Sequence, residues 1–262
     1  MKLHTFVICA YKESRYLETC IRSLEVQRDT SDILIATSTP NAYIKQLAEQ
    51  HQIPVVVNEA GQKGIGYDFD FALSCGTTPY VTIAHQDDTY APEYSKRVVE
   101  AMEQSPDTII AFTDYHEEHE TGVVLTNRNL RVKRFMLSPL KHRAFQKSRF
   151  WRRRILSFGN AICCPAVTYH RTQVQTPLFA DDAFKSNIDW MAWEKLSRKT
   201  GRFLYVPEDL MMHRVHEEAT TTELIRENKR LNEDYEMFCH FWPRWISKLL
   251  IRFYAKAEEN VD

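Results

Sequence analysis

The chain has 262 residues, a formal net charge of −1 and a hydrophobic fraction of 44%. This length fits one large α/β domain, or one domain with an appendage, and the composition excludes a disordered or polybasic chain. No apolar run reaches the roughly 18 residues of a transmembrane helix, and the N-terminus is too short and strand-like for a signal peptide. Six cysteines without CxxC spacing indicate reduced core residues, so we expect a cytoplasmic protein.

The first third of the chain alternates predicted strands with short predicted helices. Strands are expected at 3–10, 32–37 and 54–58 and from Tyr80 onward, with helices of apolar spacing between them. A loop rich in glycine, Gly61 to Gly66, precedes the third helix. Alternation of this kind predicts a mostly parallel, doubly wound α/β sheet flanked by helices.

Two adjacent carboxylates, Asp87 and Asp88, directly follow the strand that begins at Tyr80. Ligands of α/β sheets collect at the carboxyl ends of the strands, and paired acids there need a cation or hydrogen bonds to compensate them. A hard divalent ion is usually held by one or two carboxylates together with substrate phosphates. We therefore expect Mg²⁺ or Mn²⁺ at this place, although an Asp-Asp turn that caps the helix after Pro92 is the alternative.

A basic, aromatic stretch follows a strand predicted at 108–115 and a hairpin turn at Gly122. From Thr121 to Ala180 there is no Asp or Glu, and Arg and Lys are densest between Arg128 and Arg154. Three interpretations are open: nucleic-acid binding, a membrane surface, or a basic wall for a diphosphate-bearing acceptor.

The membrane interpretation is favoured over packing within the protein because a second segment has the same character, and we expect no nucleic-acid partner. The tail from Trp242 to Lys256 predicts a basic, aromatic, amphipathic helix. We expect a peripheral protein at the inner face of the membrane, with Arg152, Arg153 and Arg154 facing lipid head groups. Packing within the protein or in a homodimer is the other possibility.

The last third predicts a short strand at 167–169 and then a helix that Asn187 could cap. This helix contains Asp189, and Gly201 ends it. A strand at 202–206 follows, then the segment from His213 to His216, and then a tail helix from about 222 to 241.

In this order, the segments resemble family 2 of the inverting glycosyltransferases, which have the GT-A fold. Val7 to Glu13 with Tyr16 to Gln27 resembles the family's opening strand and helix, and Ala84 to Asp88 resembles its acidic motif. Asn187 to Leu196 resembles the helix of the catalytic base, and Leu204 to His216 resembles the closing strand with its Arg-x-His element. Together they span about 3–222.

The resemblance implies an enzyme that moves a sugar from a nucleotide-sugar donor to a glycan or lipid-linked acceptor in polysaccharide biosynthesis. Asp189 is then the catalytic base, and Asp88, Asp87 and His216 hold the metal. The expected nucleotide-sugar contacts are Ala10, Tyr11, Glu13, Thr37, Lys63, Asp87, Arg214 and His216. The expected acceptor contacts are Asn160, Trp190 and Trp193.

Some positions depart from the family pattern. Hydroxyls at Thr37 and Ser38 stand where members usually carry an Asp that holds the nucleotide base, and Ile188 stands where an acid often precedes the catalytic Asp. A catalytically silent binding module and a nucleotidyltransferase therefore stay open as alternatives.

The expected organisation has two parts. A GT-A domain covers 1–222 and carries a basic helical insertion at about 128–157, and an amphipathic helical tail covers 223–262.

Overall fold

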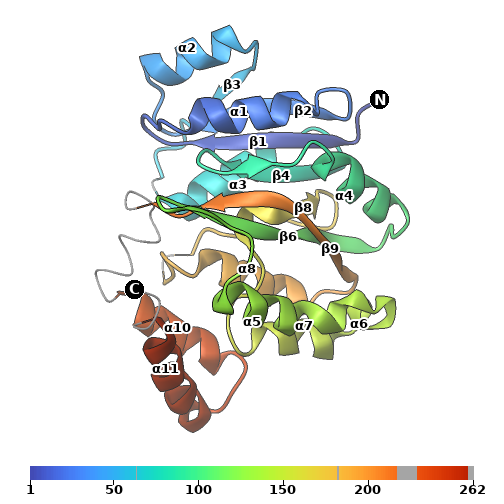
Figure 1. Ribbon diagram of the computed structural model, residues 1–262, viewed down its shortest axis with the longest axis vertical. Helices are drawn as coiled ribbons and strands as arrows, with labels where there is room; N and C mark the ends of the chain where they lie inside the picture. Colours follow the sequence, from blue (N-terminus) through green and yellow to red (C-terminus); the bar gives the residue numbers. More distant parts are fainter. Residues whose placement is uncertain (63, 182, 217–228, 259–262) are drawn as a thin grey trace.

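The computed structural model describes residues 1–62, 64–181, 183–216 and 229–258, and a nine-stranded sheet runs through its centre (Figure 1). The strands are β1 His4–Ala10, β2 Ser31–Thr37, β3 Val55–Val57, β4 Tyr80–His85, β5 Thr89–Tyr90, β6 Thr108–His119, β7 Gly122–Val124, β8 Val167–His170 and β9 Arg202–Arg214. Their order is β3-β2-β1-β4-β8-β6-β9-β5, and β7 pairs with β6.

The sheet is mixed but mostly parallel. Strands β1 to β4 are parallel to one another, and β9 is parallel to β6. Strand β8 is antiparallel to both β4 and β6, so β6 and β9 run in the same direction as β4. The carboxyl ends of β1, β2, β4, β6 and β9 consequently meet at one edge of the sheet, which is where ligands of such sheets bind.

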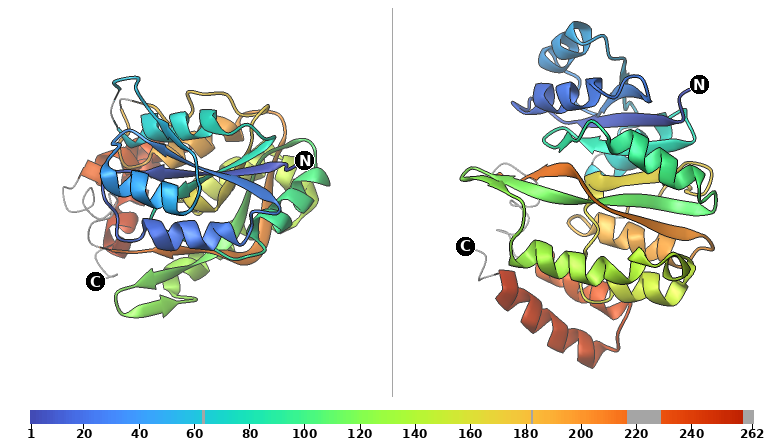
Figure 2. Two further views of the ribbon diagram at one scale, coloured as in Figure 1. Left: turned by 90° about the horizontal axis from the view of Figure 1, so that it is seen from above. Right: turned by 45° about the vertical axis from the view of Figure 1, so that its right-hand side comes forward.

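Helices cover both faces of the sheet (Figures 1 and 2). They are α1 Leu17–Glu25, α2 Ala42–Gln50, α3 Ile65–Cys75, α4 Tyr94–Glu103, α5 Arg128–Leu137, α6 Arg143–Lys147, α7 Arg149–Leu156, α8 Ile188–Ser197, α10 Lys229–Cys239 and α11 Arg244–Glu258, with short 3₁₀ turns at Ser138–Lys141 and Cys164–Ala166. None of the described helices is long and apolar enough to cross a bilayer.

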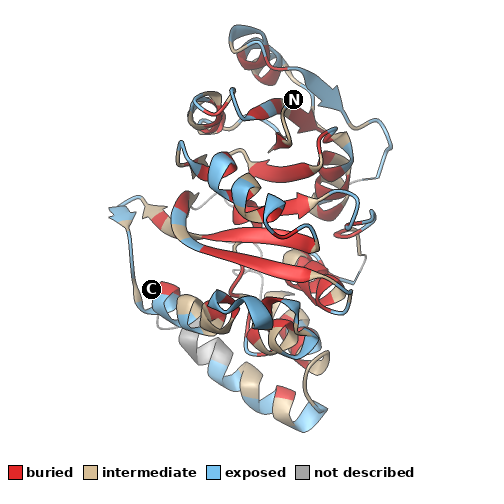
Figure 3. Ribbon diagram, turned by 90° about the vertical axis from the view of Figure 1, so that its right-hand side faces the viewer, coloured by how far each residue is buried: buried red, intermediate tan, exposed pale blue. Residues whose placement is uncertain are grey.

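Alternation along the strands divides the core into two layers. Phe6 and Ile8 of β1 pack with α1, α2 and α4, whereas Val7 between them packs with α3, α7, α8 and α10. Side chains of successive strand residues point to opposite faces, so one apolar strand serves both layers. In Figure 3 the central strands are accordingly buried along most of their length.

The predicted alternation and fold class are confirmed. The sequence did not predict β5, β6 extends to His119 beyond the expected 108–115, and the largest difference is at the last strand. The sequence predicted a strand at 202–206, but β9 continues to Arg214. Pro207 and Glu208 form a bulge between Val206, which pairs with Thr113, and Asp209, which pairs with Asp114. A bulge tolerates a proline within a sheet, and this one carries β9 on to the ligand-binding edge.

The basic stretch and the tail are helical where they are described. Helices α5, α6 and α7 occupy the basic stretch, and α10 and α11 form the end of the chain. The expected start of the tail helix near 222, and the domain boundary placed there, lie outside the described residues. Met237 and Phe238 of α10 are buried in the same core layer as α8.

Candidate active site

Asp88 is the most deeply buried acid at the carboxyl edge of the sheet. Its side chain is 0% exposed. Oδ1 accepts hydrogen bonds from Nδ1 of His213 at 3.0 Å and from the backbone N–H of Arg214 at 2.9 Å. Oδ2 has no hydrogen-bond partner among the described residues. A buried carboxylate oxygen is rarely left unpaired in a native protein, so the geometry fits an oxygen kept for a cation.

Asp87 ties the same loop to the end of β9. Its Oδ2 accepts from Nε2 of His216 at 3.0 Å, and its backbone carbonyl accepts from Nε of Arg214 at 3.1 Å. Burial alone would raise the pKa of Asp87, but the hydrogen bond from His216 and the charges of His85 and His213 outweigh it and hold the pKa below its ordinary value. Asp87 is therefore an anion at neutral pH.

His85 completes a group of possible metal ligands. One ligand atom from each of His85, Asp87 and Asp88 lies within 4.8 Å of the others. The His85 ring stacks on Phe69 with 4.9 Å between the ring centroids, and burial lowers its pKa against the opposing charges of the two aspartates. A neutral imidazole beside two carboxylates is a donor set that a divalent metal accepts.

Three contacts hold the side chain of Arg214, and the first is the hydrogen bond to the carbonyl of Asp87 described above. Its guanidinium makes an ion pair with Glu118 of β6, and it lies over the ring of Tyr16 at 4.4 Å from the centroid. The ring of His216 lies 5.0 Å from the same tyrosine ring. These contacts fix the Arg-x-His element against the acidic pair before any ligand arrives.

Asp189 lies in the first turn of α8, half-buried. Its Oδ2 accepts a hydrogen bond from Nδ2 of Asn160 at 2.6 Å, and Oδ1 accepts the backbone N–H of Trp190 at 2.7 Å. Burial raises the pKa of Asp189, opposed by the Trp190 N–H, the charge of Arg230 and the Asn160 amide. Asp189 also acts on the pKa of His85, so its carboxylate lies within electrostatic range of the metal-ligand cluster.

Helix α10 fixes the segment that leads into α8. The carboxylate of Glu233 accepts three backbone N–H groups, those of Lys185 at 2.9 Å and of Ser186 and Asn187 at 2.8 Å each. The buried Asp234 accepts Nδ2 of Asn187 at 2.7 Å. Asn187 was expected to cap α8, but its side chain makes no capping hydrogen bond and turns to α10 instead.

The predicted nucleotide contacts lie at the ends of β1 and β2. Ala10 pairs with Thr37 across the two strands, and both are buried. Tyr11 and Glu13 are exposed just beyond, and the main chain of Tyr11 exchanges two hydrogen bonds with the side chain of Gln86. Lys63 lies outside the described residues.

A carboxylate stands beside the position where the sequence seemed to lack one. Asp68 of α3 accepts a hydrogen bond from Ser38 Oγ at 3.0 Å. Its Oδ1 is buried and has no hydrogen-bond partner among the described residues, and burial raises its pKa. The acid comes from a helix 30 residues further along the chain than Ser38, so no local motif could reveal it.

Two sequence expectations need correction. Trp190 and Trp193 were expected to contact an acceptor, but both are 0% exposed. Trp190 packs on Phe238 and Trp193 on Tyr169. Their apolar area is used in the core, because fully buried side chains offer no surface to a substrate. They support the helix of Asp189 from behind.

The three arginines expected at lipid head groups also point elsewhere. Arg152 is 0% exposed, and Arg153 pairs with Glu194 and donates to the carbonyl of His240. Arg154 lies over the rings of Phe150, Phe158 and Trp242. The partners of Arg152 and Arg153 come from distant segments of the chain, which a count of local charge does not include. Arg154 contacts both the local rings of Phe150 and Phe158 and the distant Trp242.

Sequence analysis missed His85, His213, Glu118, Asp68 and the acidic pair of α10. The sequence placed His213 in the segment that leads to His216 without giving it a role, whereas the structure places it on β9 with its ring hydrogen-bonded to Asp88. His85 stands within the acidic motif from Ala84 to Asp88, so its position was a local signal. Glu118, Asp68 and the two acids of α10 act across larger sequence separations.

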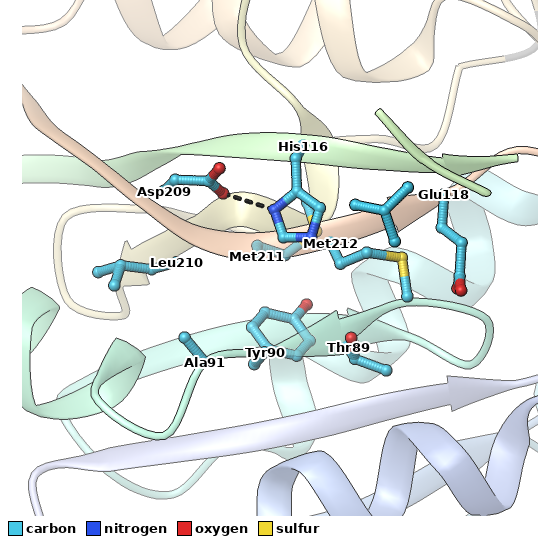
Figure 4. A pocket seen from close by; sticks show the side chains of 10 residues that line it. Thr89, Tyr90, Ala91, His116, Glu118, Asp209, Leu210, Met211 and Met212 are labelled. Atoms are coloured by element: carbon cyan, nitrogen blue, oxygen red, sulfur yellow. Dashed lines mark hydrogen bonds and ion pairs between the residues drawn. The ribbon is translucent and has the colours of Figure 1, made fainter. Parts of the chain in front are cut away.

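A separate hollow of about 250 Å³ lies along β5, β6 and β9 (Figure 4). Its wall includes the pair formed by Nδ1 of His116 and Oδ1 of Asp209, 2.8 Å apart. Asp87, Asp88 and Asp189 are not part of its lining. It therefore adjoins the site built around Asp88, with which it shares Glu118, but it does not contain the site's aspartates.

A protein-family model described as "Glycosyl transferase family 2" matches residues 5–168, more than half of the chain. No curated protein matches the sequence.

Several solved structures share the fold. S. aureus TarS 1-349 in complex with UDP-GlcNAc is 12% identical with a TM-score of 0.62, over 96% of this chain and 70% of that one. The mannosyltransferase PcManGT from Pyrobaculum calidifontis, in complex with GDP-Man and Mn²⁺, is 14% identical with a TM-score of 0.58, over 95% and 69%. The chain spans only 42% of a longer TarS chain. Identities this low establish the fold alone.

The contact between α10 and α8 can be tested through stability. Replacing Glu233 by Ala removes the acceptor of three backbone N–H groups. A buried N–H left unpaired costs about 1–3 kcal/mol, which applies to Asn187 and in part to Ser186, whereas the N–H of the exposed Lys185 can bond to water. We expect the free energy of unfolding, measured by urea denaturation, to fall by about 2 kcal/mol or more. Glu236→Ala on the exposed face of the same helix is the matched control, and an equal loss in both variants would contradict the assignment.

Proposed function

Because the chain belongs to glycosyl transferase family 2, we propose that it transfers a sugar from a nucleoside-diphosphate donor to an acceptor hydroxyl with inversion at the anomeric carbon. The observation that supports this best is that two aspartates at one edge of the sheet have pKa values shifted in opposite directions. Asp87 is held ionised beside Asp88, while the pKa of Asp189 is raised. Such a difference in pKa suits one aspartate that stays ionised to bind a cation and another that takes up a proton as the general base.

In this proposal Asp88, Asp87 and His85 hold Mg²⁺ or Mn²⁺. His216 was expected among the ligands, and its Nε2 instead orients Asp87 by hydrogen bonding. A bound divalent cation compensates the charge that grows on the leaving nucleoside diphosphate. Arg214 adds positive charge at the same edge, held ready by Glu118 and Tyr16.

The nucleotide lies across the ends of β1 and β2, between Tyr11, Glu13 and Thr37. We propose that Asp68 contacts the base, since its unpaired Oδ1 can accept an N–H group. Lys63, which was expected to contact the phosphates, lies outside the described residues.

Asp189 takes the proton from the acceptor hydroxyl. Asn160 donates to Oδ2 and holds the carboxylate in one orientation, and burial strengthens its basicity by disfavouring the charged form. Asn160 is partly exposed and lies beside the base, so it can also contact the acceptor. A glycan or a lipid-linked saccharide is the acceptor that we propose, in polysaccharide biosynthesis at the inner face of the membrane.

The released product separates this function from its alternatives. A nucleotide-sugar screen with purified protein gives a nucleoside diphosphate for a glycosyltransferase. Pyrophosphate would instead indicate a nucleotidyltransferase, and donor binding without turnover would indicate a silent binding module.

Removal of one metal-ligand charge tests the acidic pair. Asp88→Asn should abolish turnover and should weaken metal-dependent nucleotide binding measured by calorimetry, because one carboxylate is a large share of such a site. Asp209→Asn, on the same edge but outside the cluster, is the control. Normal nucleotide affinity and turnover in Asp88→Asn would remove Asp88 from the site.

Loss of the base should act on chemistry rather than on donor binding. Asp189→Asn should lower turnover by about 10²- to 10⁴-fold with donor affinity near that of the unmodified protein. The base must be ionised to accept a proton, and the pKa of Asp189 is raised. As the pH falls, the rate should therefore begin to decline at a higher pH than the ordinary pKa of an aspartate would predict. Equal loss of donor affinity and turnover would make Asp189 a donor ligand instead.

The membrane contact is proposed for α11 rather than for the three arginines. Trp245 is 71% exposed and Phe253 65%, with Leu249 exposed between them. These residues repeat every four positions and share one side of the helix. Arg244, Lys248 and Arg252 each stand one residue before them and are exposed. An apolar row beside a cationic row is typical of a helix lying in an anionic lipid surface.

Vesicle sedimentation tests this row. The full chain should bind anionic vesicles at low salt and be released by high salt, and Trp245→Ser with Phe253→Ser should reduce the bound fraction severalfold. Val26→Ser, an exposed apolar residue on another face, is the control. If the double variant binds vesicles as well as the control does, the lipid assignment fails. If vesicle binding is unchanged and self-association measured by light scattering falls, α11 contacts another copy of the chain.

A further inference from the structure

Arg152 of α7 is a buried cation that has no carboxylate partner among the residues that the structure describes. Its side chain is 0% exposed. Nη2 donates to the backbone carbonyl of Lys199 at 2.7 Å, and the guanidinium lies 5.3 Å from the centre of the Phe203 ring. Nε and Nη1 have no acceptor among the described residues. Burial, together with the nearby charge of Arg149, lowers its pKa to about 10.

This arrangement is unfavourable for the protein alone. A buried charge normally has a partner of opposite sign, since desolvation of an ion is costly. The charge that acts on Arg152 is another cation one turn earlier on the same helix face. Such a group is balanced when an anion lies beside it.

A hollow with surplus positive charge adjoins this arginine. It measures about 500 Å³ and is lined by Asp107, Lys147, Arg149, Arg152, Thr200 and Gly201. The acid among these residues is already engaged, because Asp107 pairs with Lys147 at 2.9 Å and with Arg202 at 3.3 Å. Arg149 donates to Thr200 Oγ1 at 3.0 Å and is otherwise exposed at the rim.

The hollow lies far from the proposed donor site. It adjoins the first residues of β9, whereas Asp88 contacts the last ones. A strand of 13 residues at about 3.3 Å per residue spans about 40 Å. In Figure 1, α6 and the start of β9 lie on the opposite side of the molecule from the carboxyl ends of β1 and β4.

We infer that this hollow is an anion site that takes a phosphate group, with Arg149 and Lys147 contacting the phosphate at the entrance and the buried charge of Arg152 attracting it from beneath the lining. Guanidinium groups bind phosphate oxygens through paired, charge-assisted hydrogen bonds, and Thr200 offers a hydroxyl. The phosphate comes either from a soluble phosphate ester or from a lipid head group.

Inorganic phosphate is the probe. In calorimetry of the full chain, with a chelator present, we expect saturable binding of one phosphate per chain. Arg149→Gln removes an exposed rim residue and should fold normally, and it should weaken this binding by about tenfold or more, the loss of one charge-assisted hydrogen bond. Lys96→Gln, an exposed lysine on α4, is the control.

Two further arms locate the site and its source. Arg214→Gln should leave phosphate binding unchanged, and a loss there with none in Arg149→Gln would place the phosphate in the donor site and overturn the inference. Absence of saturable phosphate binding overturns it as well. Competition by vesicles of phosphatidic acid, but not of phosphatidylcholine, assigns the phosphate to a lipid head group. Failure of both vesicles to compete assigns it to a soluble ester.

Discussion

The hydrogen bonds between Asp88 and the end of β9 hold the ligand-binding edge together. A fully buried carboxylate must find donors, and here they are the ring of His213 and the backbone of Arg214. These two residues reach Asp88 only because β9 continues past its bulge and stays paired with β6. The last strand in the chain thus completes the site that begins at the end of β4, and it leaves one oxygen of Asp88 turned to the cluster with His85 and Asp87.

A second constraint comes from the end of the chain. Glu233 and Asp234 of α10 hold the three residues that precede α8, and Trp190 packs against Phe238 behind them. The position of Asp189 therefore depends on a helix that follows β9. Burial raises the pKa of this aspartate, while histidines lower that of Asp87, so acids of the same type acquire different properties at one edge of the sheet.

Much of the fold followed from local pattern. Period-two and period-3.6 spacing located β1, β2, β4, α1 and α4 within a few residues, and Asp87 and Asp88 were correctly placed after β4. What sequence reasoning missed depends on long-range packing. Pro207 suggested the end of a strand where the structure has a bulge, and Asp68 reaches Ser38 from another element. The tryptophans beside Asp189 suggested a sugar-binding wall, but the core uses them, since aromatic spacing alone does not show which face is covered.

The acid-free stretch shows why local charge is a poor guide to surface charge. With a net charge of −1 for the chain, its cations must be balanced by acids elsewhere, and several are paired directly: Lys147 with Asp107 and Arg153 with Glu194. Those pairs join the insertion helices to the strand and helix that carry the site. Among the described residues no acid pairs with Arg152, although it is the most deeply buried of these cations. A buried cation left beside a hollow in this way has the electrostatics of a site completed by an external anion.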